Sequence, residues 1–595
     1  MNRSLHSSRP CTVRGCSVLG LVLAVGLAGC QEPATGSDAS GSSGTESTEG
    51  SDQGPTVGVD DDTSGTSTGL DPDTTTGSTT ETDSTTGDTA CEDTPEVCAA
   101  AAEAATAAAL EAVRDDPDAL RDFLVAMPLG GDLHHHLSGG VYAETYLGWA
   151  EQDGGFCIQT SDTSLSTSCG DGNDVPIPTG REDLYLDVVR AWSMFEFDPS
   201  GGQSAADHFF ATFGKFGAIS GTQHGRMLAD VRRRAATENV LYIEPMLTSN
   251  STARSLGEGL WASMGGGAMA VDDYAPLHAA LLAAPGFAAA RAKLVDEVGD
   301  SEQEAQLALG CATGQPELGC NVVARYQAYI SRSGSDSGIF GQMVAAYEAA
   351  MVEPRLVALN LVGPEDGSAA MANYDRLMDM LAYLNADYAG ISPLRLSLHA
   401  GEITASSVPA GYQLDQTQHI RKAVEIAGAR RIGHGVDVLS EGDSAGLLAL
   451  LRDQGVLVEI CLASNDIILE VSGAAHPLHD YLAQGVPVAL ATDDQGVARS
   501  SHAAEFFRGV VDQDLDYYEL KSMVRASLEY SFLPGQSLWS DYALHAVAAE
   551  CAPAPGDTPV TQPPSPACGT FLSENPRASV QRQLEAQLEA FESMY

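Results

Sequence analysis

Positive charge is scarce in this sequence, which has 31 Lys and Arg residues against 81 Asp and Glu residues and a formal net charge of −50. Nucleic acid is therefore an unfavourable partner, because proteins bind a phosphate backbone through a basic surface. Polyanionic small molecules are disfavoured for the same reason. Most of the acidic residues are expected to lie on the solvated surface, where they keep the protein soluble.

A long apolar run is missing near the start of the chain, where the apolar segment 18–29 is too short for a permanent transmembrane helix. Three arginines and no acidic residue precede it, which is typical of a secretory signal peptide. The segment Leu27-Ala-Gly-Cys30 resembles the lipobox of bacterial lipoproteins, in which the cysteine sulfur is acylated. We therefore expect an exported, periplasmic or cell-surface protein with a lipid anchor at Cys30. The alternative is an ordinary signal peptide with a chance cysteine.

Residues 31–90 lack Lys and Arg and hold almost no large apolar residue, but thirteen of them are Asp or Glu. Such a segment buries too little apolar surface to offset the entropy lost on ordering, so we predict that it is disordered. Repulsion between its like charges extends the segment, which suits a tether that holds a folded domain away from a membrane.

CxxC spacing is missing from the twelve cysteines, which argues against a zinc ribbon. Cys11 and Cys16 would leave with the signal peptide. Eight others form close pairs in sequence rich in Gly, Asp, Ser or Pro, where a disulfide can staple a short loop: Cys91/Cys98, Cys157/Cys169, Cys311/Cys320 and Cys551/Cys568. Eight cysteines allow 105 connectivities, so other pairings stay open. Such loops are typical of an oxidising compartment. Cys461 lies in an apolar segment and is predicted to be a buried thiol.

Strand-like and helix-like segments alternate from the end of the tether to about residue 530. Short apolar runs rich in β-branched residues mark eight candidate strands: 131–136, 240–247, 321–330, 356–362, 394–399, 431–438, 457–462 and 486–492. Predicted helices include 99–114, 117–127, 419–429, 445–454 and 578–591. Eight strands alternating with helices predict an α/β fold, a (β/α)8 TIM-type barrel.

The expected domain organisation follows from these changes in composition. Residues 154–180 form a predicted loop close to the mouth of the barrel. The predicted segments are a signal peptide at 1–29, a disordered acidic linker at 30–90, the barrel at 91–535 and a peripheral C-terminal extension at 536–595.

Histidines end the first candidate strand. Successive side chains of a strand point to opposite faces, so His134 and His136 share one face while His135 points away. Two imidazoles at i and i+2 are spaced to share a metal ion, although a polar histidine run in a loop would explain this segment equally well if it stood alone. The flanking Leu133 and Leu137, together with further ligand types along the chain, favour a metal site.

Three later strands also end in residues that carry chemistry. His399 is followed by Ala-Gly and then Glu402, and the glycine allows a sharp turn that brings both side chains to one cavity. His434 lies between two glycines, and the adjacent carboxylates of Asp493 and Asp494 repel each other unless a cation or a donor separates them. Each motif alone is weak evidence. Their occurrence in order at strand ends predicts a mononuclear metal site that activates water for hydrolysis.

These residues resemble the adenosine deaminase family of the amidohydrolase superfamily, and its secreted, insertion-bearing members most closely. The resemblance runs from about residue 127 to residue 505, and its motifs are Met127-Pro128, Leu133-His-x-His-Leu137, Glu244, Gly363, His399-Ala-Gly-Glu402, Arg431-Ile-Gly-His-Gly435, Glu459-x-Cys-x-x-Ser-Asn465 and Thr492-Asp-Asp494. It implies one Zn²⁺ per chain, which would lower the pKa of water toward neutrality, with four protein ligands: His134, His136, His399 and Asp493.

The resemblance also implies the hydrolysis of adenosine, and of 2′-deoxyadenosine, to the inosine nucleoside and ammonia. His434 would accept the proton of the attacking water or orient that water, and protonated Glu402 would donate a proton to the purine ring. Asp494 would bond the imidazole side of the purine, and Gly363 would offer backbone to the ring edge. Ser138 stands where many family members have an aspartate that contacts the ribose, which leaves the sugar specificity open.

Other functions stay open. A different purine, such as adenine or a modified nucleoside, keeps the same chemistry, whereas AMP is disfavoured because the motifs include no basic cluster. Another barrel hydrolase acting on lactones, amides or phosphoesters is a second possibility. Binuclear members commonly carry a modified lysine on the fourth strand, and 356–362 has none. The third possibility is a non-catalytic protein that binds nucleosides at the cell surface.

Overall fold

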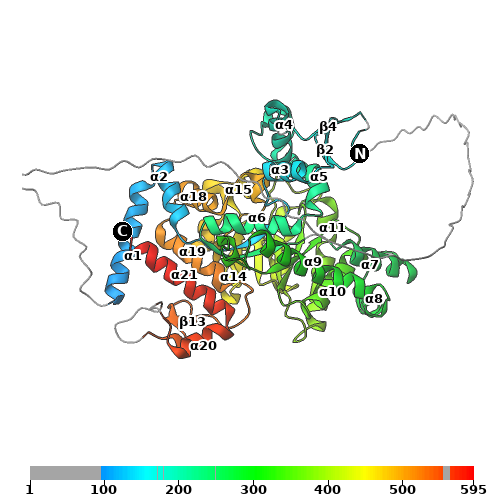
Figure 1. Cartoon of the computed structure of the whole chain (residues 1–595). Helices are drawn as coiled ribbons and strands as arrows, with labels where there is room; N and C mark the ends of the chain where they lie inside the picture. Colours follow the sequence, from blue (N-terminus) through cyan, green and yellow to red (C-terminus); the bar gives the residue numbers. More distant parts are fainter. Residues whose placement is uncertain (1–94, 171, 179, 248–249, 554–559, 561–562) are drawn as a thin grey trace, which may run out of the picture. The chain divides into compact units, whose positions relative to one another are not determined.

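The computed structural model describes residues 95–595 except 171, 179, 248–249, 554–559 and 561–562 (Figure 1). The chain divides into two units, Met1–Gly87 and Asp88–Tyr595. The predicted signal peptide, the lipid anchor at Cys30 and the acidic tether all lie outside the described residues. Among the helices that are described, none is both long and apolar enough to cross a membrane.

A parallel sheet curves into a nearly closed barrel. Its eight main strands follow one another in sequence order: β1 (Gly130–His136), β5 (Val240–Met246), β7 (Tyr326–Ser331), β8 (Leu356–Val362), β9 (Arg395–Ala400), β10 (Arg431–His434), β11 (Leu457–Ile460) and β12 (Val488–Leu490). Just beyond β12, the backbone N–H of Asp493 donates to the carbonyl of His134 over 2.8 Å, and that of His136 donates to Asp493 over 2.9 Å. These bonds join the last strand to the first, so the predicted (β/α)8 barrel is confirmed.

Strands β10 and β12 are shorter than the expected 431–438 and 486–492, and two other expected strands differ in detail. Segment 321–330 is not one strand, because the chain leaves a 3-10 turn, η2 (Leu318–Asn321), and then forms the short β6 (Val323–Ala324) beside β5 before it enters β7. Segment 457–462 ends early, because its last residue already begins helix α15 (Leu462–Leu469). In both places an apolar run continues past the strand, so composition alone overestimates the strand length.

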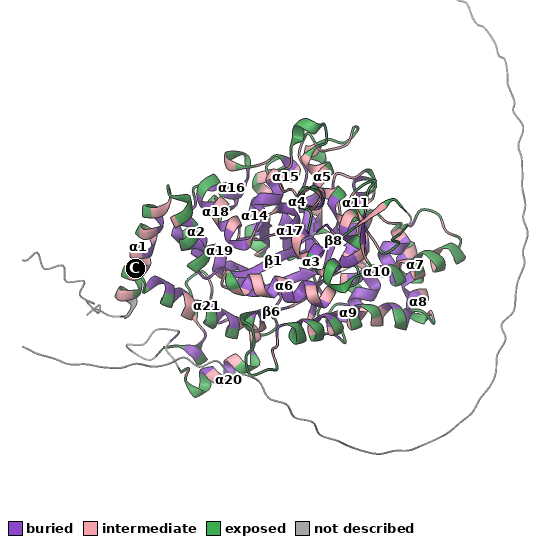
Figure 2. Cartoon of the chain, turned by 45° about the horizontal axis from the view of Figure 1, so that its top comes forward, coloured by how far each residue is buried: buried purple, intermediate pink, exposed green. Residues whose placement is uncertain are grey.

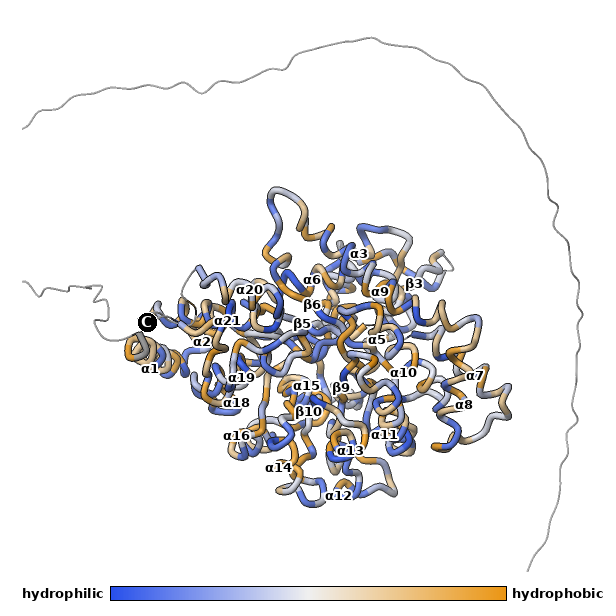
Figure 3. Tube along the Cα trace, turned by 90° about the horizontal axis from the view of Figure 1, so that it is seen from below, coloured by the Kyte–Doolittle hydropathy of each residue, from blue (hydrophilic) through white to orange (hydrophobic). Residues whose placement is uncertain are grey.

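Helices surround the barrel: α6 (His224–Thr237), α10 (Asp336–Ala350), α11 (Ser368–Asp387), α13 (His419–Glu425), α14 (Ser444–Gln454), α16 (Leu478–Ala483), α18 (His502–Gln513) and α19 (Tyr517–Glu529). Figure 2 shows the strands buried at the centre and exposed residues on the outer helices. Hydrophilic and hydrophobic residues alternate along these helices (Figure 3), as expected for elements that cover a core on one face. All seven residues of β8 are buried, which explains its continuous apolar sequence.

The longest excursion from the barrel lies between β1 and β5. It holds α3 (Ala143–Asp153), a small antiparallel sheet of β2 (Cys157–Gln159), β3 (Leu165–Ser166) and β4 (Asp174–Pro176), then α4 (Glu182–Trp192), the 3-10 turn η1 (Pro199–Gly201) and α5 (Ala205–Ser220). Figure 1 shows α3, α4, β2 and β4 beside α5 at the top of the folded unit. The predicted Cys157–Cys169 disulfide closes the small sheet. The indole N–H of Trp192 donates to the Thr163 carbonyl over 2.8 Å and ties the sheet to α4.

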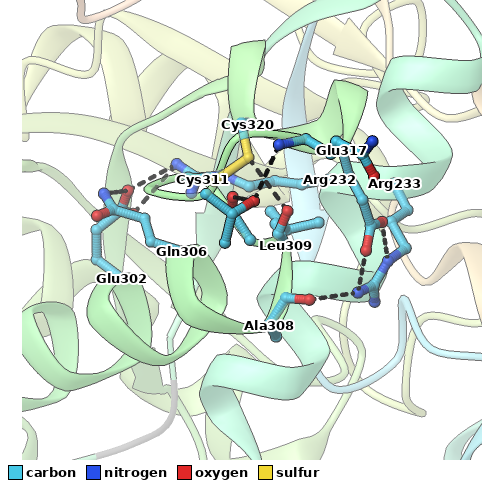
Figure 4. Close-up of a disulfide and its surroundings, with 12 residues drawn as sticks. Arg232, Arg233, Glu302, Gln306, Ala308, Leu309, Cys311, Glu317 and Cys320 are labelled. Atoms are coloured by element: carbon cyan, nitrogen blue, oxygen red, sulfur yellow. Dashed lines mark hydrogen bonds and ion pairs between the residues drawn. A yellow bond between two sulfur atoms is a disulfide. The ribbon is translucent and has the colours of Figure 1, made fainter.

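A second excursion, between β5 and β7, was not assigned from the sequence. It contains α7 (Ser251–Ser263), α8 (Val271–Ala283) and α9 (Phe287–Ala308). The predicted Cys311–Cys320 disulfide closes the loop after α9, where the Arg233 guanidinium pairs with Glu317 over 2.5 Å and also donates to the Ala308 carbonyl (Figure 4).

The C-terminal segment follows α19 with β13 (Trp539–Asp541), β14 (Ala546–Val547), the 3-10 turn η4 (Ala549–Cys551), α20 (Pro566–Glu574) and α21 (Pro576–Glu592). The predicted Cys551–Cys568 disulfide joins η4 to α20. Apolar residues of α21, among them Leu584 and Phe591, belong to the main hydrophobic core. Cys461 is buried and is a free thiol among the described cysteines, as predicted. Cys91, the expected partner of Cys98, lies outside the described residues.

Candidate metal centre and active site

The predicted site residues meet at the carboxyl ends of the barrel strands, where (β/α)8 enzymes place their chemistry. His134 and His136 end β1, His399 lies near the end of β9, and Asp493 follows β12. His135 points away from them, as the alternation of a strand requires, and its Nδ1 lies 2.8 Å from Thr492 Oγ1.

Four side chains present ligand atoms to one another. The Nε2 atoms of His134 and His399 are 3.1 Å apart, and those of His136 and His399 are 3.2 Å apart. The Oδ1 atom of Asp493 lies 3.2 Å from His136 Nε2 and 3.5 Å from His134 Nε2. All four donor atoms lie within 4.8 Å of one another. The structure thus brings together all four residues that the sequence predicts as ligands.

The neighbours of these imidazoles test whether the group fits a metal ion. His134 Nδ1 lies 2.7 Å from a carboxylate oxygen of Glu459, and His399 Nδ1 lies 2.8 Å from Asn360 Oδ1. Because both partners are acceptors, each Nδ1 carries the proton and each Nε2 is left with a lone pair. Two lone pairs that face each other over 3.1 Å repel unless a cation lies between them. Three imidazoles and one carboxylate are a ligand set that zinc accepts.

Asp493 is oriented in the same way. Its Oδ2 accepts a hydrogen bond from Ser464 over 2.6 Å, whereas its buried Oδ1 has no hydrogen-bond partner among the described residues. A buried carboxylate oxygen without a donor is costly, so this atom also favours a cation in the site. Asp493 adopts a left-handed backbone with φ +56°, and His434 does so with φ +69°. Such strain in residues other than glycine is typical of functional positions.

Glu402 is held over the site by its own backbone. Gly401 adopts φ +78°, and the N–H groups of Gly401 and Glu402 donate to the two carboxylate oxygens of Glu365 over 3.0 and 2.8 Å. Glu365 is itself paired with His419 over 2.5 Å. Burial, followed by the negative charges of Asp493 and Glu365, raises the pKa of Glu402 well above its ordinary value. Burial and these charges therefore favour a protonated Glu402, as a proton donor requires.

His434 and Asp494 complete the polar end of the site. The Nε2 atom of His434 lies 3.6 Å from Glu402 Oε1, and burial lowers the pKa of His434 to about 3. Burial raises the pKa of Asp494 to about 8, with the charge of Asp493 acting in the same direction. Gly139 makes room for this carboxyl, since a Cβ atom at that position would lie 1.6 Å from Asp494 Oδ1.

These groups open into a cavity of about 410 Å³. Its polar end is lined by His136, His399, Glu402, His434, Asp493 and Asp494, and both Ser138 and Gly363 also line it. Its apolar wall includes Phe209, Phe210 and Phe213 of α5, together with Met227, Met246, Leu247, Tyr329 and Ile468. None of the described lining residues is Lys or Arg. The volume lies in the usual range of small-molecule sites, roughly 300–1,000 Å³.

Several residues of the site were not assigned a role from the sequence. Phe209, Phe210 and Phe213 belong to an excursion that the barrel pattern does not include. Asn360 gave a usable signal, because a lone amide inside the buried strand β8 needs a hydrogen-bond partner. Glu365 gave no such signal, because it follows its strand in a loop where acidic residues are common.

Comparison with known proteins agrees with the site. The family model described as adenosine deaminase matches residues 277–538. The adenine deaminase of Rhizobium meliloti (strain 1021) is 31% identical over 207 residues, which are 34% of this chain and 55% of that protein. The adenosine deaminase of Clostridium perfringens (strain SM101 / Type A) is 29% identical over 145 residues, which are 24% of this chain and 39% of that protein. The chain thus spans about half the length of these curated relatives.

Solved structures give a weaker likeness. The adenine deaminase of Arthrobacter aurescens aligns with a TM-score of 0.38 and 20% identity, over 68% of this chain and 94% of that one. The apo N6-methyl-AMP deaminase of Arabidopsis thaliana aligns with a TM-score of 0.43 and 17% identity, over 70% and 94%. The match to the family model and the named relatives, taken with the site motifs, show that this chain is similar to the adenosine deaminase family.

Proposed function

We propose that this protein is a zinc-dependent deaminase that hydrolyses adenosine and 2′-deoxyadenosine to the inosine nucleosides and ammonia. One observation carries the proposal: the cavity joins a three-histidine, one-aspartate donor set and the buried acid Glu402 to an apolar wall that can cover a purine nucleoside. A free purine base would leave much of the 410 Å³ unfilled. A nucleotide would find no Lys or Arg among the described lining residues to pair with its phosphate.

The four donors His134, His136, His399 and Asp493 would hold one zinc ion. When bound, zinc supplies Lewis acidity that makes water a nucleophile at neutral pH. Glu402 holds a proton at its carboxyl group and delivers it to the ring nitrogen next to the amino-bearing carbon. His434 orients the water or takes its proton at Nε2, the imidazole nitrogen that faces Glu402.

The remaining residues position the substrate. Asp494 is kept largely protonated by its buried site, so its carboxyl can donate a hydrogen bond to the imidazole side of the purine. Gly363 adopts φ +99°, a conformation that favours glycine, and presents backbone to the cavity without a side chain. Ser138 lines the same cavity, and its hydroxyl is available to the sugar. The three phenylalanines of α5 exclude water from the apolar side.

Deamination of free adenine is the second candidate, because a relative 31% identical over its matched region is named an adenine deaminase. In that case the part of the cavity that we assign to the sugar would stay filled with water. A non-catalytic nucleoside-binding protein is a weaker third candidate, since such a protein has no need of a buried acid beside the metal ligands.

The test is ammonia release by the zinc-loaded full chain from adenosine, 2′-deoxyadenosine, adenine and AMP. Turnover of both nucleosides, lost on chelation and restored by zinc, is the expected result. Turnover of adenine alone would transfer the proposal to the second candidate. Zinc bound at one ion per chain without turnover of any of the four would overturn it.

We also propose that the protein acts outside the cytoplasm on a lipid anchor at Cys30. The disulfides Cys157–Cys169, Cys311–Cys320 and Cys551–Cys568 support export, because such bonds persist in oxidising compartments. Labelling of the expressed protein with a radioactive fatty acid tests the anchor. Label should enter the native chain and be absent from Cys30→Ser, and equal labelling of both would refute acylation at this residue.

A further inference from the structure

A chain of buried hydrogen bonds runs from a helix N-terminus to the imidazole of His434. The backbone N–H of Leu478 lies 3.2 Å from His476 Nδ1. His476 Nε2 lies 3.1 Å from Asn465 Oδ1, and Asn465 Nδ2 lies 3.0 Å from His434 Nδ1. The three side chains are at most 3% exposed, so water does not compete for these bonds. The mechanism above uses only the last member of this chain.

The first bond sets the direction of all the others. Leu478 begins α16, and a backbone N–H in the first turn of a helix has no partner within that helix and can only donate. His476 Nδ1 must therefore accept, and because a neutral imidazole carries one proton, that proton is on Nε2. Burial lowers the pKa of His476 to about 4, so the ring is neutral at pH 7.

The same logic passes through the amide. His476 Nε2–H donates to Asn465, so the atom that receives this bond is the amide oxygen, and the NH2 group faces His434. An NH2 group donates, and His434 Nδ1 therefore accepts over 3.0 Å. Turning the amide around would place its NH2 group against the N–H of His476 and would leave both groups without an acceptor. The network thus leaves His434 one tautomer, with its proton on Nε2.

We propose that Asn465 and His476 are positioning residues that hold His434 as the Nε2–H tautomer, so that His434 donates a hydrogen bond into the cavity and does not accept a proton from water. Its Nε2 faces Glu402 Oε1 at 3.6 Å and has no hydrogen-bond partner among the described residues. The N–H is therefore available to the attacking oxygen. The inference rests on the proposed function and selects the orienting role of His434 from the two roles given above.

The first measurement is the protonation of the two ring nitrogens of His434. Two-bond 1H–15N correlation spectra of the zinc-loaded full chain, labelled at histidine, separate protonated from unprotonated imidazole nitrogens. The His434 signals are assigned by their loss in His434→Gln. We expect an unprotonated Nδ1 and a protonated Nε2 at pH 7. A protonated Nδ1 would overturn the proposal, and this readout does not depend on which substrate the enzyme uses.

The variant that tests this chain of hydrogen bonds is Asn465→Asp. It keeps the shape of the side chain, but its carboxylate can only accept hydrogen bonds. It should move a proton onto His434 Nδ1 in the same spectra and lower kcat by up to about 10⁴-fold, the loss seen when a catalytic histidine is held in the wrong tautomer. The KM, the zinc content and the melting temperature should stay near those of the native chain. Asn465→Asp with kcat within about threefold of native, despite the moved proton, would overturn the catalytic part of the proposal.

Two further comparisons separate positioning from a merely structural effect. Asn575→Asp is the matched control, because Asn575 is also buried but lies in the C-terminal segment. The Asn575 side chain donates to the Phe571 carbonyl over 2.8 Å and accepts from the Gln536 N–H over 2.7 Å. Asn575→Asp should lose stability without changing the His434 spectrum or kcat. At position 476, His476→Gln keeps a donor for Asn465 and should retain most of kcat, whereas His476→Phe should not. Equal losses of kcat in His476→Gln and His476→Phe would refute the role of His476 in holding the His434 tautomer.

Discussion

Replacing the carboxylate of Glu365 by an amide, in Glu365→Gln, should destabilise the protein by about 3 kcal/mol at pH 7. Glu365 is 1% exposed. Burial favours its neutral form, but the hydrogen bond and charge of His419, with the charge of Arg332, hold its pKa at about 2 against an ordinary value of 4.5. At roughly 1.4 kcal/mol per pKa unit, this difference gives about 3 kcal/mol in favour of the ionised form.

The pH dependence identifies the origin of this stability. The pKa of Glu365 is lower in the folded than in the unfolded chain, so its contribution is fully present above pH 4.5 and is lost as the pH falls toward 2. Urea unfolding of the native chain and of Glu365→Gln should therefore differ by about 3 kcal/mol at pH 7 and by about half of that at pH 3. A difference that is as large at pH 3 as at pH 7 would refute the reasoning.

Glu365→Gln should also slow turnover, because this carboxylate holds the backbone of Gly401 and Glu402. A loss of about 10- to 100-fold in kcat is expected, since small misplacements of a catalytic group have effects of that size. Zinc content should not change. The matched control is Glu425→Gln, an exposed position whose substitution should alter stability by less than about 0.5 kcal/mol. Native kcat in a variant that has lost the expected stability would show that Glu365 does not position Glu402.

Three other outcomes follow from the site. Chelation should abolish ammonia release and lower the melting temperature, and added zinc should restore both. A melting temperature that chelation does not change would argue against a buried ion. Glu402→Gln should abolish turnover and keep zinc bound, and loss of zinc in that variant would assign this residue to the metal instead. Gly139→Ala should raise KM about tenfold with kcat less affected, because the added Cβ would displace the Asp494 carboxyl. A native KM in this variant would show that Asp494 does not contact the substrate.

The sequence predicts the barrel and the polar end of its cavity because both follow from short-range rules. Strand alternation alone puts His134 and His136 on one face and His135 on the other, and the structure agrees. The local disulfide pairs are also predictable, because each closes a loop of at most 17 residues in sequence separation. The helices α7 to α9 were missed because an insertion between strands adds nothing to the barrel pattern.

The apolar wall was missed for a different reason. Phe209, Phe210 and Phe213 read as ordinary core residues of an amphipathic helix, and nothing in α5 itself says that one side of it faces a cavity. Their role appears only when the excursion between β1 and β5 returns over the carboxyl ends of the strands. One wall of the cavity is therefore supplied by a segment whose sequence does not carry the family motifs.

The second layer of the site shows most clearly what a motif cannot contain. A motif names the atoms that act, but whether His434 donates or accepts depends on where its proton is. That is decided by the Leu478 backbone N–H, through His476 and Asn465. This N–H can only donate, and it reaches His476 because α16 starts there. In the proposed network, the start of α16 thus determines which nitrogen of the His434 imidazole carries the proton. A chain with the same motif but without this backbone N–H would carry the same residues. Its motif would not determine which ring nitrogen of the histidine carries the proton.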